Sequence, residues 1–101
     1  MDTRRILEAF DRIARERDWL PLQTPKNLAI ALANETAELL HEFQWLSDEQ
    51  VAAMNGAQRS RIGHEAADIL MYLLALCDRM DIDLEQAVQE KIALNEARFL
   101  K

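Results

Sequence analysis

Residues 59–80, RSRIGHEAADILMYLLALCDRM, form the stretch that decides the fold. Apolar side chains recur along it at helical spacing and predict one long α-helix. One apolar stripe lies beside Glu65 and consists of Ile62, Ile69, Leu73 and Leu76. A second covers the opposite side and consists of Ala66, Ala67, Leu70, Leu74 and Cys77. A helix that is apolar on both sides is buried on both. A chain of 101 residues can hardly cover both, so we expect a homo-oligomer with this helix at its centre.

The rest of the chain also predicts helices. Half of the residues are hydrophobic, only two are Gly and two are Pro, and no useful segment alternates with a period of two, which favours an all-α protein. Further helices are predicted over residues 3–18, 25–45 and 84–99, with a short helix from Ser47 to about residue 54 that Asn55-Gly56 ends. Thr24 and Asp83 are the expected N-caps of two of the long helices. The expected fold is one domain over residues 1–101, a bundle of four main helices plus a short one.

Two pairs of acids dominate the candidate chemistry, Glu35 with Glu38 and Glu65 with Asp68. Each pair has the i, i+3 spacing that places both carboxylates on one helix face, at the edge of the apolar stripe. Acids at this spacing are common on solvated surfaces, and one pair alone would fit that interpretation better. Four acids converging at the interior need a cation, because a buried unpaired carboxylate is costly. Oxygen ligands without Cys or His suit Mg²⁺ or Mn²⁺.

Polar side chains interrupt the apolar stripe of the last predicted helix. Lys91 and Asn95 fall inside the stripe and Arg98 lies at its edge. These residues either extend to solvent along the helix surface or form a phosphate-binding edge opposite the carboxylates. Glu42, on the same face as Glu35, is either an extra ligand or a residue at the rim of the site. The spacing leaves both alternatives open.

Charge and hydropathy exclude several classes of partner. The net charge of −6 argues against binding to a nucleic-acid backbone. The longest apolar run, residues 69–77, is too short to span a bilayer. The start of the chain leads into an amphipathic helix instead of a signal sequence. Cys77 is the single cysteine and cannot form an intrachain disulfide. We expect a soluble cytoplasmic protein without a membrane partner.

Four motifs, in order and in register, resemble the short MazG-like all-α nucleoside triphosphate pyrophosphatases, and most of all their dCTP pyrophosphatase branch. They are Thr24-Pro-Lys-Asn-Leu28, Glu35-x-x-Glu38 with Phe43-Gln-Trp45, Glu65-x-x-Asp68-Ile-Leu-x-Tyr72-Leu, and Lys91-x-x-x-Asn95-x-x-Arg98-Phe99. The resemblance implies a helical bundle completed as a homodimer, or as a homotetramer made of two dimers. It also implies hydrolysis of a (deoxy)nucleoside triphosphate, dCTP or a modified dCTP, to the monophosphate and pyrophosphate, a house-cleaning activity on the nucleotide pool.

The resemblance also assigns roles residue by residue. Glu35, Glu38, Glu65 and Asp68 match the positions that hold Mg²⁺ or Mn²⁺, and Glu38, with Glu35, would be catalytic. The expected substrate-binding residues are Lys26 and Asn27 of the first motif, Trp19, Trp45 and Tyr72 around the base, and Lys91, Asn95 and Arg98 at phosphate or sugar. Without the family match, core packing would be the better interpretation for Trp45 and Tyr72. Gln23 stands where the branch commonly has a histidine, which leaves the base preference open.

Rival functions share parts of this pattern. Phosphoribosyl-ATP pyrophosphohydrolases and dimeric dUTPases share this arrangement of metal-binding carboxylates. A di-iron carboxylate bundle has the spacing of Glu38-x-x-His41, but it needs a second such motif, and Glu65-x-x-Asp68 does not supply one. A helical interaction module without turnover is the non-enzyme alternative, and the presence of all four acids argues against it.

Overall fold

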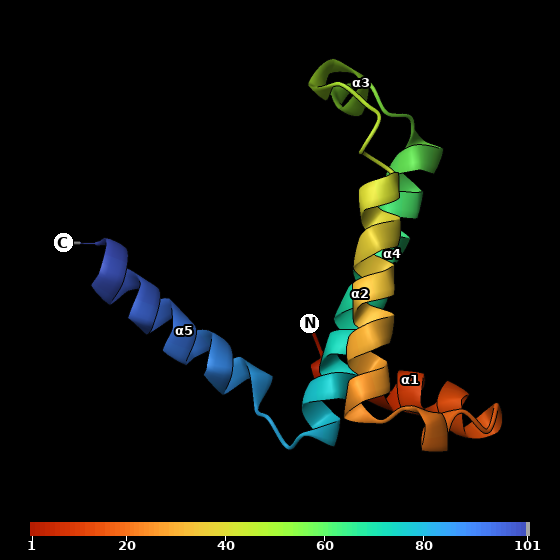
Figure 1. Cartoon of the computed structure of the whole chain (residues 1–101), viewed down its shortest axis with the longest axis vertical. Coiled ribbons are helices and arrows are strands. Elements are labelled where there is room, and N and C mark those ends of the chain that lie inside the picture. The colour runs from red at the N-terminus through yellow and green to blue at the C-terminus, as the bar shows by residue number, and fades with distance from the viewer. Residues whose placement is uncertain (101) are drawn as a thin grey trace.

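The computed structural model describes residues 1–100, which form five α-helices and a 3₁₀ turn and contain no strand (Figure 1). The elements are α1 (Thr3–Glu16), η1 (Leu20–Leu22), α2 (Pro25–His41), α3 (Asp48–Ala52), α4 (Gly56–Arg79) and α5 (Leu84–Phe99). The all-α prediction, with four main helices and a short one, is confirmed. No helix in the described part is long and apolar enough to cross a membrane.

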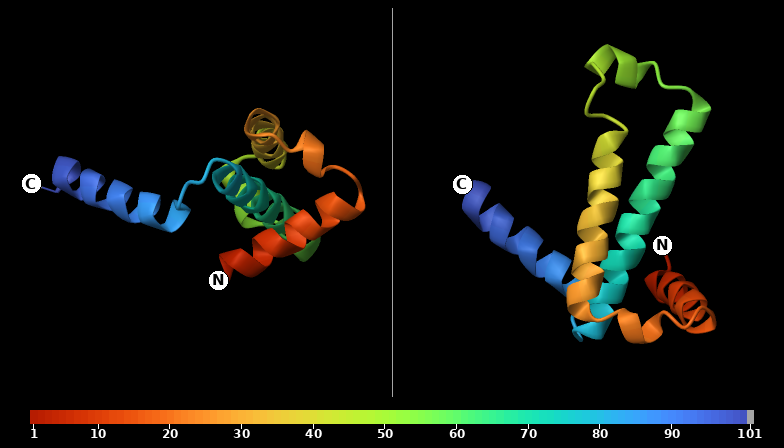
Figure 2. Two further views of the ribbon diagram at one scale, coloured as in Figure 1. Left: turned by 90° about the horizontal axis from the view of Figure 1, so that it is seen from below. Right: turned by 45° about the vertical axis from the view of Figure 1, so that its right-hand side comes forward.

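The long helices α2 and α4 lie side by side and antiparallel, with α3 in the connection at one end and α1 across the other end (Figures 1 and 2). The core sits where α1, α2 and α4 meet. Leu7, Leu28 and Ala75 are buried there, and Phe10, Tyr72 and Leu76 pack around them. Beyond this core α2 and α4 remain in close contact, which determines which side chains of the two helices meet.

The helix α4 begins earlier than its apolar pattern predicts, at Gly56 instead of Arg59. The side chain of Asn55 accepts a hydrogen bond from the Gln58 N–H, and the Gln58 side chain accepts one from the Asn55 N–H, each at 2.9 Å. This reciprocal pair is a capping box, which satisfies free N–H groups at a helix start. Asn55-Gly56 thus starts α4, and the prediction that it serves to end the preceding helix was wrong.

The helix α2 ends at His41, four residues before the predicted boundary at Trp45. The N–H groups of Phe43 and Gln44 both donate to the Leu40 carbonyl, and the chain turns through residues 42–45 towards α3. Apolar spacing continues through this turn, which is why periodicity alone placed the boundary too late. The consequence is that Trp45 belongs to a turn and not to the α2 face that carries Glu35.

The end of α1 places Trp19. Asp18 adopts a left-handed conformation with φ 57°, its N–H donates to the Arg15 carbonyl at 3.1 Å, and the Trp19 N–H donates to the Ala14 carbonyl at 2.8 Å. These two bonds form a Schellman motif, which satisfies the last carbonyls of a helix. The Arg17 guanidinium carbon lies 5.2 Å from the centre of the Trp19 ring. Trp19 is therefore held at a fixed position next to α1, although α1 ends two residues before the predicted boundary.

The last helix, α5, stands away from the other helices (Figure 2). Close packing between long helices within residues 1–100 is confined to α2 with α4 and α1 with α4. Val88, Ile92 and Phe99 are exposed on α5, Phe99 to 69%. A helix of this length with an uncovered apolar stripe is marginal in water by itself.

Candidate active site

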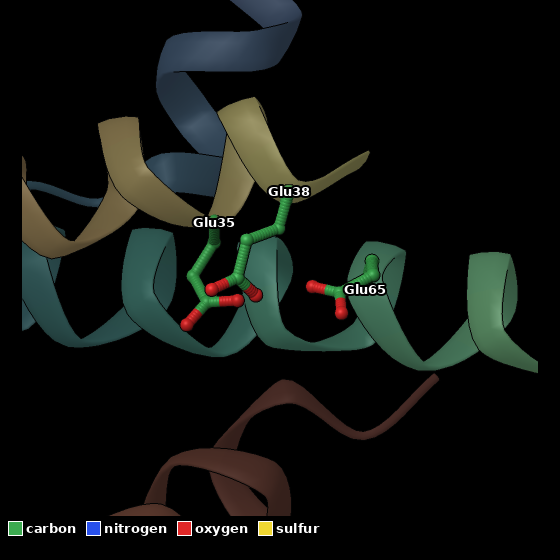
Figure 3. A group of neighbouring side chains, drawn as sticks. All are labelled: Glu35, Glu38 and Glu65. Atoms are coloured by element: carbon green, nitrogen blue, oxygen red, sulfur yellow. The ribbon is translucent and has the colours of Figure 1, made fainter. Parts of the chain in front are cut away.

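Three of the four predicted acids converge between the two long helices. Glu35 and Glu38 project from α2 towards α4, which contributes Glu65 (Figure 3). One carboxylate oxygen from each lies within 4.8 Å of those from the other two. Because α2 and α4 are antiparallel, residues far apart in the sequence come to the same level of the helix pair. The predicted convergence of the two motifs is thus present for these three residues.

Two oxygens of this cluster are buried without a hydrogen bond. Among the described residues, Oε2 of Glu35 and Oε2 of Glu65 are the buried side-chain oxygens that lack a hydrogen-bond partner. The ion pairs formed within residues 1–100 do not include either acid. Orphaned buried oxygens are rare in proteins because each retains its desolvation cost. Hard carboxylate oxygens without a protein donor fit a divalent cation such as Mg²⁺ or Mn²⁺.

The mutual repulsion of the acids appears in their pKa values. Burial, together with the charges of Glu38 and Asp68, raises the pKa of Glu35 from 4.5 to about 7. Burial also raises the pKa of Glu65, and the charge of Glu38 adds to this effect. Both effects disfavour a second or third negative charge at the same place. At pH 7 Glu35 is therefore about half protonated in the metal-free chain, and a bound cation would displace that proton.

Asp68 lies beside the three converging acids rather than among them. It is not one of the residues whose oxygens meet within 4.8 Å. Its charge nevertheless raises the pKa values of Glu35, Glu65 and Tyr72. Asp68 follows Glu65 by one helical turn on α4, so it contributes negative potential to the site in this conformation.

An aromatic pair borders the acids. Burial raises the pKa of the Tyr72 phenol, and the charges of Glu35, Asp68 and Glu38 raise it further, which places Tyr72 close to the carboxylates. The ring of Phe10 from α1 meets the Tyr72 ring edge to face, with centroids 5.2 Å apart. Sequence reasoning missed Phe10 as a site neighbour, because its place on the apolar stripe of α1 indicated only core packing.

A family model described as "MazG-like family" matches residues 30–99, which include all four acids. The chain belongs to the MazG-like family. It is 41% identical over 100 residues to dCTP pyrophosphatase 1 of Bos taurus and 38% identical to that of Homo sapiens. Each match covers 97% of this chain but 57% of the relative, so the chain spans little more than half of their length. The crystal structure of a pyrophosphatase from Archaeoglobus fulgidus DSM 4304 has a TM-score of 0.89 and 35% identity, covering 100% of this chain and 94% of that one.

The remaining predicted residues of this MazG-like chain lie apart from the acids or at their margin. Lys26 and Asn27 are exposed in the first turn of α2, where the Asn27 amide donates to the Leu22 carbonyl at 2.8 Å. Trp19 is 46% exposed and Trp45 85% exposed. Glu42 forms an ion pair with Arg61, with 3.4 Å between Oε1 and Nε, and is not part of the carboxylate cluster.

The residues predicted to bind phosphate do not reach the acids within one MazG-like chain. Lys91, Asn95 and Arg98 are exposed on α5, which extends away from the pair formed by α2 and α4 (Figure 1). The Arg98 guanidinium carbon lies 5.0 Å from the centre of the Phe99 ring. In one chain these three residues lie on a helix that does not pack closely on α2 or α4.

The raised pKa of Glu35 predicts that metal binding by this MazG-like site depends on pH. Below about pH 7 Glu35 carries a proton in the metal-free chain, and a cation must displace it. We expect the affinity for Mn²⁺ to fall as the pH is lowered from 8 to 6, and each bound ion to displace about half a proton from Glu35 at pH 7 and more at lower pH. Calorimetric titration in buffers of different ionisation enthalpy measures both quantities. An affinity independent of pH in this range, with no proton release, would contradict the expected protonation of the cluster.

Proposed function

We propose that this chain is a metal-dependent nucleoside triphosphate pyrophosphatase that cleaves the α–β phosphoanhydride bond. The observation that carries the proposal is the cluster of Glu35, Glu38 and Glu65, with buried oxygens that no protein donor satisfies. The names of the relatives, dCTP pyrophosphatase 1 and an archaeal pyrophosphatase, support the same chemistry. A di-iron site is not supported, because the three converging acids include no histidine.

Glu35, Glu38 and Glu65 would hold Mg²⁺, with Mn²⁺ as a substitute, and Asp68 would add negative charge beside them. The ion supplies charge neutralisation at phosphate oxygens and lowers the pKa of bound water. Glu38 is the exposed member of the cluster, whereas Glu35 and Glu65 are half-buried. This accessibility makes Glu38 the proposed general base: it accepts a proton as water attacks the α-phosphorus and the bond to the β-phosphate oxygen breaks.

A second copy of the chain would complete the site. A groove of about 710 Å³ lies between α1, α4 and the start of α5, where the half-buried Leu70 and the buried Leu74 and Cys77 of α4 meet polar side chains such as Asp78 and Asp83. An adjoining hollow of about 380 Å³ contains Ala66 and Met71 of the same helix. The exposed apolar stripe of α5 and the apolar hollow beside Ala66 and Met71 on the same chain suit exchange between two copies. We propose a homodimer, alone or paired into a tetramer, in which α5 of the partner brings Lys91, Asn95 and Arg98 to phosphate or sugar.

Tyr72 beside the acids, and aromatic and polar side chains at the ends of α1 and α2, would bind the nucleoside. Tyr72 lies near the carboxylates, and Trp19 and Trp45 expose their rings at the ends of α1 and α2. Indole and phenol rings stack on bases. Lys26 and Asn27 lie at the start of α2, next to the turn that follows Trp19. We propose deoxycytidine triphosphates as the preferred substrates, because the 41%-identical relative is named for dCTP.

A substrate panel tests this proposal. Pyrophosphate release is measured with Mg²⁺ from dCTP, 5-methyl-dCTP, the other canonical dNTPs and NTPs, dUTP and phosphoribosyl-ATP. Highest kcat/KM with a deoxycytidine nucleotide is the expected result. Preference for dUTP or phosphoribosyl-ATP would keep the reaction but overturn the substrate. No release from any nucleotide by folded, metal-bound protein would favour an interaction module instead.

A further inference from the structure

Three polar side chains tie separate segments of the chain together away from the carboxylates. Arg79, in the last turn of α4, donates from Nη2 to Asp11 Oδ1 of α1 at 3.0 Å and to Gln23 Oε1 at 3.2 Å. Its Nη1 donates to the neighbouring Asp78 at 3.1 Å. The side chains of Arg79 and Asp11 are each only 18% exposed. A partly buried, charge-assisted hydrogen bond of this kind is stronger, and more restricted in direction, than an ion pair at the surface.

Asp11 and Gln23 belong to two segments that each carry an aromatic residue. Asp11 directly follows Phe10, whose ring contacts Tyr72 beside the acids. Gln23 is the C-cap of η1, the short turn that begins immediately after Trp19. Arg79 itself is on α4, the helix that carries Glu65 and Tyr72. One guanidinium therefore connects the helix of the acids with both segments that carry aromatic side chains.

Apolar packing alone does not fix this geometry. Leu7, Leu28 and Ala75 hold α1 and α2 close to α4, but apolar contact is non-directional. The guanidinium is planar and its donors have fixed directions, so two bonds from Nη2 set the rotation of α1 and the path of the turn after Trp19. Because Arg79 can only donate, the Gln23 amide must present its oxygen to it. Lysine at this position could not reproduce the fork.

We propose that Arg79 is a positioning residue that, through Asp11 and Gln23, holds Phe10 and Trp19 in place for binding the nucleoside part of the substrate. The inference rests on the proposed function for the identity of the ligand. It assigns Arg79 to recognition of the nucleoside and not to the metal or to the phosphates. In a site that depends on orientation, a displacement of about 1 Å is enough to lower the reaction rate by up to 10²-fold.

The products of the proposed reaction separate this role from a general loss of structure. Binding of dCMP, which contains the nucleoside, and of inorganic pyrophosphate, which does not, is measured by calorimetry with Mg²⁺. Arg79→Met is expected to weaken dCMP about tenfold and to leave pyrophosphate and Mn²⁺ binding unchanged. In kinetics, KM for dCTP rises by a similar factor while kcat changes little. Arg79→Lys is expected to bind dCMP almost as weakly as Arg79→Met.

Two further variants keep the test independent of folding. Gln23→Met removes the bond to the turn but leaves the ion pair with Asp11, so it is expected to weaken dCMP binding without lowering the Tm. Arg12→Met, which breaks an exposed ion pair on α1, is the matched control and should change neither ligand. Unchanged dCMP binding in both Arg79→Met and Gln23→Met, or equal loss for dCMP and pyrophosphate, overturns the inference. A wild-type chain that binds dCMP but hydrolyses nothing contradicts the proposed function while leaving this comparison intact.

Discussion

Glu38→Gln is expected to reduce nucleotide hydrolysis by about 10²- to 10⁴-fold, the range for loss of a general base. The substitution keeps the size of the side chain but removes the charge and the proton acceptor. It also removes one of three carboxylates that converge within 4.8 Å, so affinity for Mg²⁺ should fall as well. The measurement is kcat and KM for dCTP at saturating Mg²⁺, which separates a weakened metal site from a lost chemical step.

Folding should not suffer from this change. Glu38 is the exposed member of the cluster, and removing one of several mutually repelling acids relieves repulsion in the metal-free chain. We therefore expect a Tm without metal equal to or above that of the wild type. Glu8→Gln, at an exposed position on α1 outside the cluster, is the matched control and should retain activity. Activity of Glu38→Gln within a few-fold of the wild type would remove Glu38 from the mechanism.

Mixed assemblies of two inactive variants are expected to regain activity. In the proposed dimer, one chain supplies the acids and its partner supplies Lys91 on α5. Glu38→Gln and Lys91→Ala chains each lack one half of every site in their own homodimers. A heterodimer contains one site with intact acids and an intact Lys91, and one site that lacks both. The two variants are co-expressed with different affinity tags. In a random mixture about half of the dimers are heterodimers with one intact site of two, so we expect about a quarter of the wild-type activity.

The same experiment has an internal control. Glu38→Gln mixed with Glu65→Gln should stay inactive, because both substitutions affect acids of the same chain. If Lys91→Ala alone is fully active, Lys91 has no part in the reaction. If Lys91→Ala is inactive and mixing with Glu38→Gln restores nothing, α5 does not act across two chains.

The helices and the acidic cluster could be predicted because they depend on local order in the sequence. The i, i+3 spacing of Glu35 with Glu38 is a property of a single helix, as is their place at the edge of an apolar stripe. Antiparallel packing of α2 on α4 then brings Glu65 to them. The two-sided apolar pattern of α4 predicted burial on both sides, and Leu74 and Cys77 of the second side are already buried within one chain, whereas the homo-oligomer stays a prediction.

Other features depend on contacts between distant residues and could not be predicted from spacing. Phe10 borders the acids only because α1 crosses the ends of α2 and α4. From the sequence Arg79 is only an arginine near the end of a helix. Its bonds to Asp11 and Gln23 arise because the chain folds these distant residues against it. The position of α5 could not be predicted, because its apolar stripe is exposed and packs closely on no other long helix within residues 1–100. The start of α4 was missed because Asn55-Gly56 fits both the end of one helix and the capping box of the next.

We propose above all that the carboxylates of Glu35, Glu38 and Glu65 direct hydrolysis to the α–β bond of a nucleoside triphosphate. Phosphorus NMR of dCTP incubated with the protein and Mg²⁺ tests it most directly, because it identifies both products during the reaction. Equimolar dCMP and pyrophosphate, with turnover stopped by EDTA and restored by added Mg²⁺, is the predicted result. Formation of dCDP and phosphate, or turnover unaffected by EDTA, would contradict the account.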